Sequence, residues 1–515
     1  MSKLRHTFLT GAVFHLFLAA QAHAGLNTDP FVLDRTFNGG AVIEDGFAAT
    51  SLSTEQIPQR IARLSDGGVV VAGLVQPAYS SSTSLPANVG LVRYGPDGSR
   101  VPWANPTPGY SYFNNMYLDY PNTSGAKFAR VDAVVVLAGY IYVLIDYAGA
   151  NSDADILAFG EDGHFVNIFG AFTTSLNEYG VGLVPYTIPN CIGVVSCPMV
   201  IAFANYTTAG GRHIVTSKRF AMGTSGFPAF VPNGTLGVDN TYGPYNNGAN
   251  DFPAPDWTCS AGSNCNVAAG AVTAVRTDSG DPTVYVGGYF QNGSTRYFTA
   301  VFAVDGSSGL LLPDFSQGGF DKIDMTPPQV NGSSGAFAIL ATTGGSRTDD
   351  DVFVVSDVPL HCSSGVGTTR LHGVSGGVYV SYGNAYGLAY FGGDDTYPCP
   401  ATYPTTIASA ATIEGHRLVV AGRRITYAPP SADTSEYEVA IVRTDDGQTL
   451  DDRTQQLLMS NGEPRIAGSQ GWSDVAGNGS GEFFLTGSLL APNTGVPIFG
   501  TTRIASDRIM GSSFE

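Results

Sequence analysis

A strand-and-turn unit recurs along the chain and constrains the fold more than any other feature of the sequence. The segment 63–73 reads RLSDGGVVVAG, and the segment 89–100 reads VGLVRYGPDGSR. Each joins a run of apolar or β-branched residues to an Asp-Gly turn. Glycine supplies the positive φ of a tight turn, and branched side chains suit a pleated surface. We therefore interpret the pair as two neighbouring strands of one sheet.

Both halves of this unit recur downstream. Copies of the first half are IYVLIDY at 141–147, MVIAFANY at 199–206, TVYVGGY at 283–289, DVFVVSD at 351–357, RLVVAGR at 417–423 and EFFLTGS at 482–488. The second half recurs as ILAFGEDG at 156–163, TAVFAVDG at 299–306 and VAIVRTDDG at 439–447. Weaker copies of it are TSKRFAMG at 216–223 and IFGTTRI at 498–504, and in the fifth unit only a trace remains near Leu371.

Seven units predict an all-β protein. Their anchors are spaced 59 to 84 residues apart, at Val71, Val143, Ala202, Val286, Val354, Val420 and Leu485. A unit this long exceeds a WD40 blade of roughly 40 to 45 residues, and four short strands with generous loops would fill it. Coils of an open β-solenoid usually repeat in far fewer residues, so we expect a closed β-propeller of seven blades, each with about four antiparallel strands.

The two ends of the chain complement each other. The segment 31–40, FVLDRTFNGG, matches the tail that follows a complete unit, as in LLPDFSQGGF at 311–320, yet no head precedes it. The last unit has a head around Phe484 but only the ending DRIMGSSFE. We therefore predict that the N-terminal segment closes the ring by adding a strand to the last blade, which removes two exposed sheet edges.

These motifs resemble a known family. Heads of the form DGGVVVAG, followed by LVRYGPDG and by the tail LDRTFNGG, are similar to the delta-60 repeat of secreted bacterial proteins. The resemblance implies a propeller-like fold with repeats of about 55 to 60 residues. The family's motifs are structural, so the resemblance implies no catalytic residues.

The N-terminus predicts export. Residues 1–24 combine Lys3 and Arg5, an apolar stretch and an Ala-x-Ala site, which is the pattern of a secretory signal peptide. We expect a single propeller domain over 25–505 and a C-terminal tail over 506–515. The predicted location is the periplasm, the cell surface or the exterior of the cell. No later segment has the roughly 20 uninterrupted apolar residues of a membrane helix, so we expect no membrane span. The net charge of −18 argues against nucleic acid as a partner.

The cysteines predict disulfides. All six lie beyond the predicted signal, at Cys191, Cys197, Cys259, Cys265, Cys362 and Cys399. An exported protein with an even number of cysteines usually oxidises them all. The spacing favours Cys191–Cys197, Cys259–Cys265 and Cys362–Cys399. Metal ligation is the alternative, and the absence of any Cys-x2-Cys argues against it.

No motif predicts a catalytic site. The sequence HGVSGG at 372–377 places Ser375 in a G-x-S-x-G pattern, but a strand-like run follows it instead of a helix. Acidic residues cluster at Asp153 and Asp155, at 349–351, and at 445–446. Most aspartates that precede glycine, such as Asp97, Asp162, Asp305 and Asp446, are explained by turns. Calcium on the loops is the alternative, and the absence of the EF-hand spacing argues against it.

Other candidate residues are dispersed. The histidines beyond the predicted signal are His164, His213, His361, His372 and His416, and they show no metal-ligand spacing. We expect Arg93 and Arg443, which hold related places in two units, to pair with turn aspartates; the alternative is that they point into the propeller channel. The abundant aromatic residues suit carbohydrate stacking on a loop-rich face, but packing between blades explains them more simply.

These observations predict a binding or scaffold module for a protein or a glycan, without a cofactor and as a monomer. One alternative is a polysaccharide hydrolase or lyase that uses carboxylates at the channel mouth, such as those at 349–351 facing Asp445 or Asp446. Another is a purely structural envelope protein. The binding function rests on an analogy of fold.

Overall fold

The structure is a computed structural model, and it describes the residues that form the body of the molecule. These are residues 43–45, 56–75, 88–108, 111–112, 115, 117–120, 127–148, 152–172, 176–189, 196–222, 242–243, 249–253, 265–275, 282–293, 296–327, 330, 332–344, 346–384, 386–394, 398–427, 434–455, 471–477, 482–490 and 497–504. The predicted signal (1–24) and C-terminal tail (506–515) lie outside them.

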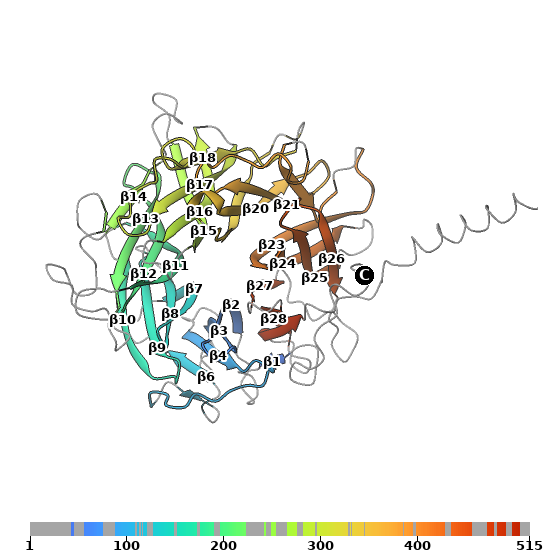
Figure 1. Cartoon of the computed structure of the whole chain (residues 1–515). Coiled ribbons are helices and arrows are strands. Elements are labelled where there is room, and N and C mark those ends of the chain that lie inside the picture. The colour runs from blue at the N-terminus through green and yellow to red at the C-terminus, as the bar shows by residue number, and fades with distance from the viewer. Residues whose placement is uncertain are drawn as a thin grey trace, which may run out of the picture.

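Seven antiparallel sheets stand around a central axis and confirm the predicted propeller (Figure 1). Blade 1 contains β2 (Gln56–Arg63), β3 (Val69–Val75), β4 (Asn88–Tyr94) and β6 (Tyr117–Tyr120), with the short β5 (Ser111–Tyr112) at its edge. Blade 2 contains β7 (Lys127–Leu137), β8 (Tyr140–Ala148), β9 (Ala154–Gly160) and β10 (Phe165–Phe172). Blade 3 contains β11 (Glu178–Pro189), β12 (Ser196–Thr207), β13 (His213–Ala221) and β14 (Ala249–Phe252).

The remaining blades follow the same order from the axis outwards. Blade 4 contains β15 (Cys265–Val275), β16 (Thr283–Asn292), β17 (Tyr297–Asp305) and β18 (Phe320–Ile323). Blade 5 contains β19 (Gly335–Thr342), β20 (Asp351–Pro359), β21 (Ser364–His372) and β22 (Leu388–Phe391). Blade 6 contains β23 (Tyr403–Glu414), β24 (Arg417–Tyr427), β25 (Thr434–Arg443) and β26 (Thr449–Gln455). Blade 7 contains β27 (Trp472–Gly477), β28 (Phe483–Leu490) and β29 (Pro497–Ile504), and β1 (Ile43–Asp45) pairs with β29.

The first and last blades meet directly. The inner strand β2 contacts β27, β28 and β29. A buried cluster joins Val71 and Val92 of blade 1 to Phe484 and Phe499 of blade 7. β1 lies at the outer edge of blade 7, where Glu44 is opposite Gly500. The segment 31–40, for which the sequence predicts ring closure, lies outside the described residues, so that role stays a prediction.

A β-bulge interrupts the ladder between the first and second strands in every blade. The register shifts fall at Pro58/Arg60, Phe128/Arg130, Gly180/Gly182, Ala269/Ala271, Ala336/Ala338, Ala408/Ala410 and Trp472/Asp474. A bulge leaves one residue unpaired and redirects the strand. The second strand carries glycine opposite the bulge in four blades, at Gly73, Gly288, Gly422 and Gly487.

An arginine near the end of the third strand links several blades to the next one. The turns between first and second strands and between third and fourth strands lie at one end of the ring, which we call the turn face. There Arg93 donates from Nη1 to the Glu161 carbonyl oxygen (3.0 Å). Equivalent bonds are Arg219 to Gly306 (3.1 Å), Arg370 to Asp445 (3.4 Å) and Arg503 to Pro96 (2.5 Å). In every case the acceptor lies in the third-to-fourth-strand turn of the next blade. We call these bonds the arginine latches.

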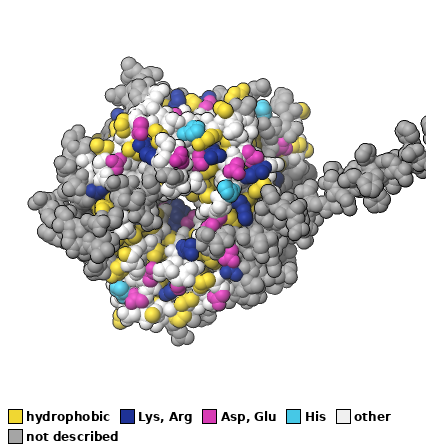
Figure 2. Space-filling model, viewed as in Figure 1, with side chains coloured by type: hydrophobic (Ala, Val, Ile, Leu, Met, Phe, Trp, Pro, Cys, Tyr) yellow, Lys and Arg dark blue, Asp and Glu magenta, His cyan; other side chains and the backbone are white. Residues whose placement is uncertain are grey.

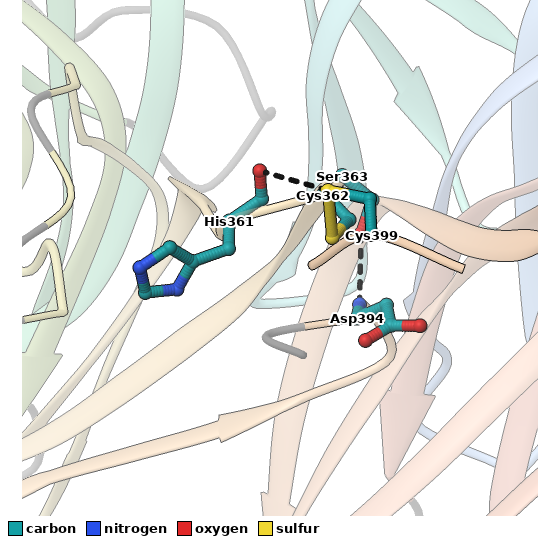
Figure 3. Close-up of a disulfide and its surroundings, with 5 residues drawn as sticks. All are labelled: His361, Cys362, Ser363, Asp394 and Cys399. Atoms are coloured by element: carbon teal, nitrogen blue, oxygen red, sulfur yellow. Dashed lines mark hydrogen bonds between the residues drawn. A yellow bond between two sulfur atoms is a disulfide. The ribbon is translucent and has the colours of Figure 1, made fainter. Parts of the chain in front are cut away.

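A disulfide ties blade 5 to the chain that leads into blade 6 (Figure 3). Cys362 and Cys399 are bonded, with Cα atoms 5.3 Å apart, as the sequence predicts. Around it, Cys362 N donates to the Asp394 carbonyl oxygen (3.2 Å) and Asp394 N donates to Ser363 Oγ (2.8 Å). Cys197 and Cys265 are also in disulfides, but Cys191 and Cys259 lie outside the described residues, so those pairings stay predictions.

Helices contribute almost nothing to the described fold. The only helical element there is the 3-10 turn η3 (Arg347–Asp349). Among the described residues, no helix has the length and apolar character to cross a membrane. The described part of the chain is therefore built almost entirely from strands.

Candidate functional site

The turn aspartates hold their own loops together. Asp97 accepts bonds from Ser99 N (3.0 Å) and Ser99 Oγ (2.6 Å), and these bonds hold the pKa of the Asp97 carboxyl below its ordinary value. Asp305 accepts from Ser307 N in the same way (2.8 Å). Arg93 pairs with Asp66 at 2.5 Å, and Arg443 pairs with Asp446 at 3.0 Å. Turn formation therefore explains these carboxylates, as the sequence indicates.

The acidic clusters of blades 5 and 6 meet at an arginine instead of facing each other across a pocket. Arg370 pairs with Asp351 (2.6 Å) and donates to the Asp445 carbonyl oxygen (3.4 Å). Its guanidinium carbon lies 4.3 Å from the centre of the Tyr379 ring. The neighbouring carboxylates are used locally: Asp349 accepts from Ser346 N, Asp350 from Gly344 N and Asp446 from Gln448 N.

The G-x-S-x-G segment forms an ordinary turn. Ser375 Oγ accepts from Gly377 N (3.2 Å), and His372 N donates to the Gly377 carbonyl oxygen (3.0 Å). A bridge between Leu371 and Val378 follows, so the serine is not presented on a strand-to-helix turn. The His372 ring stacks on Tyr379, with centroids 3.6 Å apart.

The histidines do not gather. His164 pairs with Asp162 in blade 2 (2.5 Å), His213 contacts Thr207 in blade 3, and His416 lies 3.7 Å from Asp445 on blade 6. Over the described part of the chain, no three His, Cys, Asp or Glu side chains converge in a way that would hold a metal ion.

A cavity of about 210 Å³ lies on the ring axis, and every inner strand contributes to its wall. Its charged lining residues come from adjacent strands: Arg60 of β2, Asp132 of β7 and Asp474 of β27. Blades 3 to 6 contribute apolar residues and Ser409. One side of the axial cavity is therefore polar and the other apolar. Figure 2 shows the face hollowed near the middle of the ring.

Polar side chains on the first or second strands of four blades bind backbone N–H groups at or near the bulges of the next blade. A carboxylate or amide oxygen of one blade accepts from a backbone N–H of the next inner strand. The four bonds are Asp474 Oδ2 to Ile61 N (2.9 Å), Gln59 Oε1 to Val131 N (2.7 Å), Asp146 Oδ1 to Gly180 N (2.6 Å) and Asn205 Oδ1 to Ala269 N (2.8 Å). These bonds join blades 7, 1, 2, 3 and 4 in sequence and give Asp474 and Asp146 a structural role.

Asp132 differs from these carboxylates because it binds no backbone N–H. Arg130 forms ion pairs with both Asp132 and Asp146. The second oxygen of Asp132, Oδ2, is buried without a hydrogen-bond donor. Burial, and then the charge of Asp146, raise the pKa of Asp132 well above its ordinary value, and burial also raises the pKa of Asp146. The pair therefore retains a proton at pH values where an exposed aspartate has lost it.

A second hollow, of about 650 Å³, lies between the outer strands of blades 4 and 5. We call it the Tyr386 groove and define it by Asp321, Ile323, Asp324, Val378, Tyr386 and Leu388. Ile323 and Leu388 are buried and form an apolar floor. Tyr386 is 63% exposed beside it.

The rim of the Tyr386 groove is fixed by an ion pair. Arg296 Nη2 donates to both oxygens of Asp324 (2.6 Å each), and its Nε donates to the Gly332 carbonyl oxygen (2.7 Å). On β18, Asp321 Oδ1 accepts from Lys322 N (2.9 Å), and burial raises the pKa of Asp321. The groove thus combines an aromatic ring, an apolar floor and charged hydrogen-bonding groups.

Sequence reasoning missed the residues of both hollows. Arg60, Asp132 and Asp474 occupy equivalent parts of different inner strands, but these strands are the least regular part of the repeat. Tyr386 follows the sequence Gly-Asn-Ala, and only its glycine-rich surroundings (YGNAYG) indicate exposure. The interpretation of most aromatic residues as packing is correct for the fully buried Tyr94, Tyr142, Tyr285 and Tyr437.

Comparisons show similarity of fold only. No family model matches the chain, and no curated protein matches it, so membership of the delta-60 repeat family stays a prediction. Among solved structures, the phage phi92 endosialidase gives a TM-score of 0.38 at 8% identity over 90% of this chain and 68% of its own. The polysaccharide lyase Uly1 gives 0.38 at 10% identity (87% and 90%). The WD40 domain of SCAP from fission yeast gives 0.35 at 8% (91% and 98%). These TM-scores are low, and we base no functional assignment on them.

Proposed function

We propose that the protein is an exported glycan-binding module and that the Tyr386 groove is its binding site. Export is supported by the predicted signal and by the Cys362–Cys399 disulfide, because disulfides persist mainly in oxidising compartments. The observation that supports binding most strongly is the 63% exposed Tyr386 ring beside an apolar floor and fixed polar groups.

The chemistry of the groove suits a sugar. The C–H face of a sugar packs on an aromatic ring, and its hydroxyl groups pair with carboxylates and guanidinium groups. Tyr386 provides the ring, while Asp321, Asp324 and Arg296 provide the polar partners. The ion pair between Arg296 and Asp324 holds two of these groups in place before a ligand arrives, which lowers the entropic cost of binding.

Size decides between the two hollows. Small-molecule sites typically have volumes of about 300–1,000 Å³. The Tyr386 groove, at about 650 Å³, falls within this range, whereas the axial cavity, at about 210 Å³, has too little room for an oligosaccharide. The groove also lies on the outer surface, where a chain of sugars can extend past it.

Substitution of Tyr386 tests the proposal. We expect Tyr386→Ala to weaken binding to the glycan that the wild type retains by about tenfold, or roughly 1.4 kcal/mol, because the stacking surface is lost. The measurement is affinity electrophoresis through a panel of soluble polysaccharides, followed by calorimetry on the retained one. Tyr179→Ala is the matched control, because Tyr179 is 41% exposed on β11 of blade 3.

The same panel separates the alternatives. Unchanged binding by Tyr386→Ala, or no retention of the wild type by any glycan, would contradict the proposal. Release of new reducing or unsaturated sugar ends would support the polysaccharide hydrolase or lyase instead. Binding only to an envelope protein, unaffected by Tyr386→Ala, would support the scaffold function.

A further inference from the structure

The axial cavity contains a guanidinium group with free hydrogen-bonding capacity. Arg60 Nε donates to the Asp132 carbonyl oxygen (2.6 Å), and Nη1 donates to the Gln59 carbonyl oxygen (2.8 Å). Its third nitrogen, Nη2, has no acceptor, and the side chain forms no ion pair with any residue that the structure describes. Arg60 is only partly buried and lines the cavity, so this edge of the guanidinium is available to a ligand.

The nearby carboxylates do not compete for this edge. Asp474 accepts from two backbone groups, Ile61 N and Val475 N (2.9 Å each). One carboxylate oxygen of Asp132 pairs with Arg130. The other, Oδ2, is buried against Gly180, and a Cβ added to Gly180 would lie 2.7 Å from it. Neither carboxylate accepts a hydrogen bond from the Arg60 guanidinium, but both lie near enough for the charge of Arg60 to lower their pKa values.

The opposite wall accepts an apolar group. Val181, Val272, Ile339 and Ala410 line the cavity on the blades that carry no charge there. A water molecule occupies about 30 Å³ of liquid, so about 210 Å³ gives room for roughly seven groups of that size. The space has room for a carboxylate with a short hydrocarbon body.

We propose that the axial cavity binds a small monocarboxylate, with its carboxylate on Arg60 Nη2 and its hydrocarbon body against Val272 and Ile339. A planar carboxylate matches the fork of a guanidinium group, and the bond is charge-assisted. The apolar body gains from leaving water on the opposite wall. This site is separate from the Tyr386 groove and does not depend on the proposed glycan function.

Proton linkage follows from the surroundings of Asp132. Three charged groups act on it: Arg60 on β2, Arg130 on β7 and Asp146 on β8. Asp474 on β27 lines the same polar side of the cavity, and the facing part of β11 is Gly180–Gly182. An anion on Arg60 cancels part of the positive charge that favours ionised Asp132. Binding is therefore accompanied by proton uptake at Asp132, and affinity falls as the pH rises.

The test uses hexanoate and its neutral amide, hexanamide, as probes of the full-length protein. We expect calorimetry or ligand-detected NMR to show one saturable hexanoate site and at least tenfold weaker binding of hexanamide, a difference of about 1.4 kcal/mol. Arg60→Gln should lose the hexanoate site, whereas Arg93→Gln, which changes an arginine on the turn face, should keep it. Because the pKa of Asp132 is raised, Asp132→Asn should keep the site and remove the decline in affinity that accompanies ionisation of this carboxyl as the pH rises.

Each outcome is decisive. Equal binding of the two probes, retention of the site by Arg60→Gln, or no saturable binding to the folded wild type would overturn the proposal and leave a cavity that holds only water. If Arg60→Gln does not fold, the proposal is still tested by comparing the binding of hexanoate and hexanamide to the wild type and to Asp132→Asn. Neither of these measurements requires Arg60→Gln.

Discussion

Gly288 has no room for even a methyl group. A Cβ at this position would lie 1.9 Å from the Ala268 carbonyl oxygen and 2.7 Å from the Ala269 Cα, at the bulge of β15. The equivalent glycines Gly73 and Gly422 would place a Cβ 2.2 Å and 2.3 Å from the carbonyls of Ile57 and Ile407. In these blades the backbone of the inner strand approaches the second strand too closely for a side chain. This explains why the VAG and VGG copies of the repeat end in glycine, at Gly73, Gly288 and Gly422.

We expect Gly288→Ala to destabilise the protein by about 2–3 kcal/mol, because the added methyl group must displace the bulge. Urea denaturation followed by tryptophan fluorescence measures the change. Gly210→Ala is the control: its Cβ would meet nothing closer than 3.9 Å, so its free energy of unfolding should stay within about 1 kcal/mol of the wild type. Equal stability of the two variants would refute the steric explanation.

At the scale of single residues, sequence analysis succeeded where a residue acts on its own turn. The pairing of Arg93 and Arg443 with turn aspartates is confirmed. It failed where function depends on residues from different blades, as at Arg60 and Asp474, which are 414 positions apart in the chain and line one cavity. Patterns of nearby residues in the sequence predict turns. Residues from distant blades, such as Arg60 and Asp474, are seen to be neighbours only once the ring is closed.

At the scale of strands, the arginine latches explain the copies that the sequence patterns find weak. The segments 216–223 and 498–504 lack an Asp-Gly turn, yet each contains a latch arginine, Arg219 or Arg503. In blade 5, Arg370 lies near the end of β21, next to Leu371, and a turn at Gly373–Gly377 follows in place of Asp-Gly. An arginine near the end of the third strand therefore marks the three units in which the Asp-Gly turn is missing.

Removal of one latch should be measurable. Arg93 is largely buried, pairs with Asp66 and donates to the Glu161 carbonyl oxygen of blade 2. We expect Arg93→Met to lower the free energy of unfolding by about 1–2 kcal/mol, because the acceptors lose a charged donor. Thermal and urea denaturation provide the measurement. Arg63→Met, at an exposed end of β2, should change stability by no more than about 0.5 kcal/mol.

The number of blades and the order of their strands were predictable from the repeat. The seven anchors lie on the second strands β3, β8, β12, β16, β20, β24 and β28, one in each blade. The inner strands and their bulges were not predictable, because their sequences differ from RIAR in β2 to SAAT in β23. The inner strands line the axial cavity, and outer strands and loops line the Tyr386 groove, so neither candidate site follows from the repeat of the second and third strands.

At the scale of the whole molecule, its carboxylates divide into two groups that respond to pH in opposite ways. Burial raises the pKa of Asp119 and of Asp155 to about 6, from an ordinary value of 3.8. Their contribution to stability is fully present below pH 3.8 and is lost as the pH rises through about 6. Turn aspartates such as Asp97 have a lowered pKa, so their contribution is lost as the pH falls below 3.8.

We therefore expect the melting temperature to be highest between about pH 4 and about pH 6 and to decline towards pH 8. Asp155→Asn should flatten the decline above about pH 6, because it removes a buried group that must ionise there. Asp97→Asn should leave that decline unchanged and alter only the acid side. A melting temperature that rises steadily from about pH 5 to about pH 8 would show that the buried carboxylates do not control stability.

Blades 1 and 7 are held together by residues from opposite ends of the chain. The bond between Ile61 and Asp474 spans 413 positions, and the latch from Arg503 to Pro96 spans 407. During synthesis or translocation, blade 1 must wait with an uncovered flank until the last strands arrive. Contacts between such distant segments form slowly, and an uncovered sheet flank invites association with other chains. The final joining of these two blades is therefore the step at which a chaperone would have most effect on the yield of native protein.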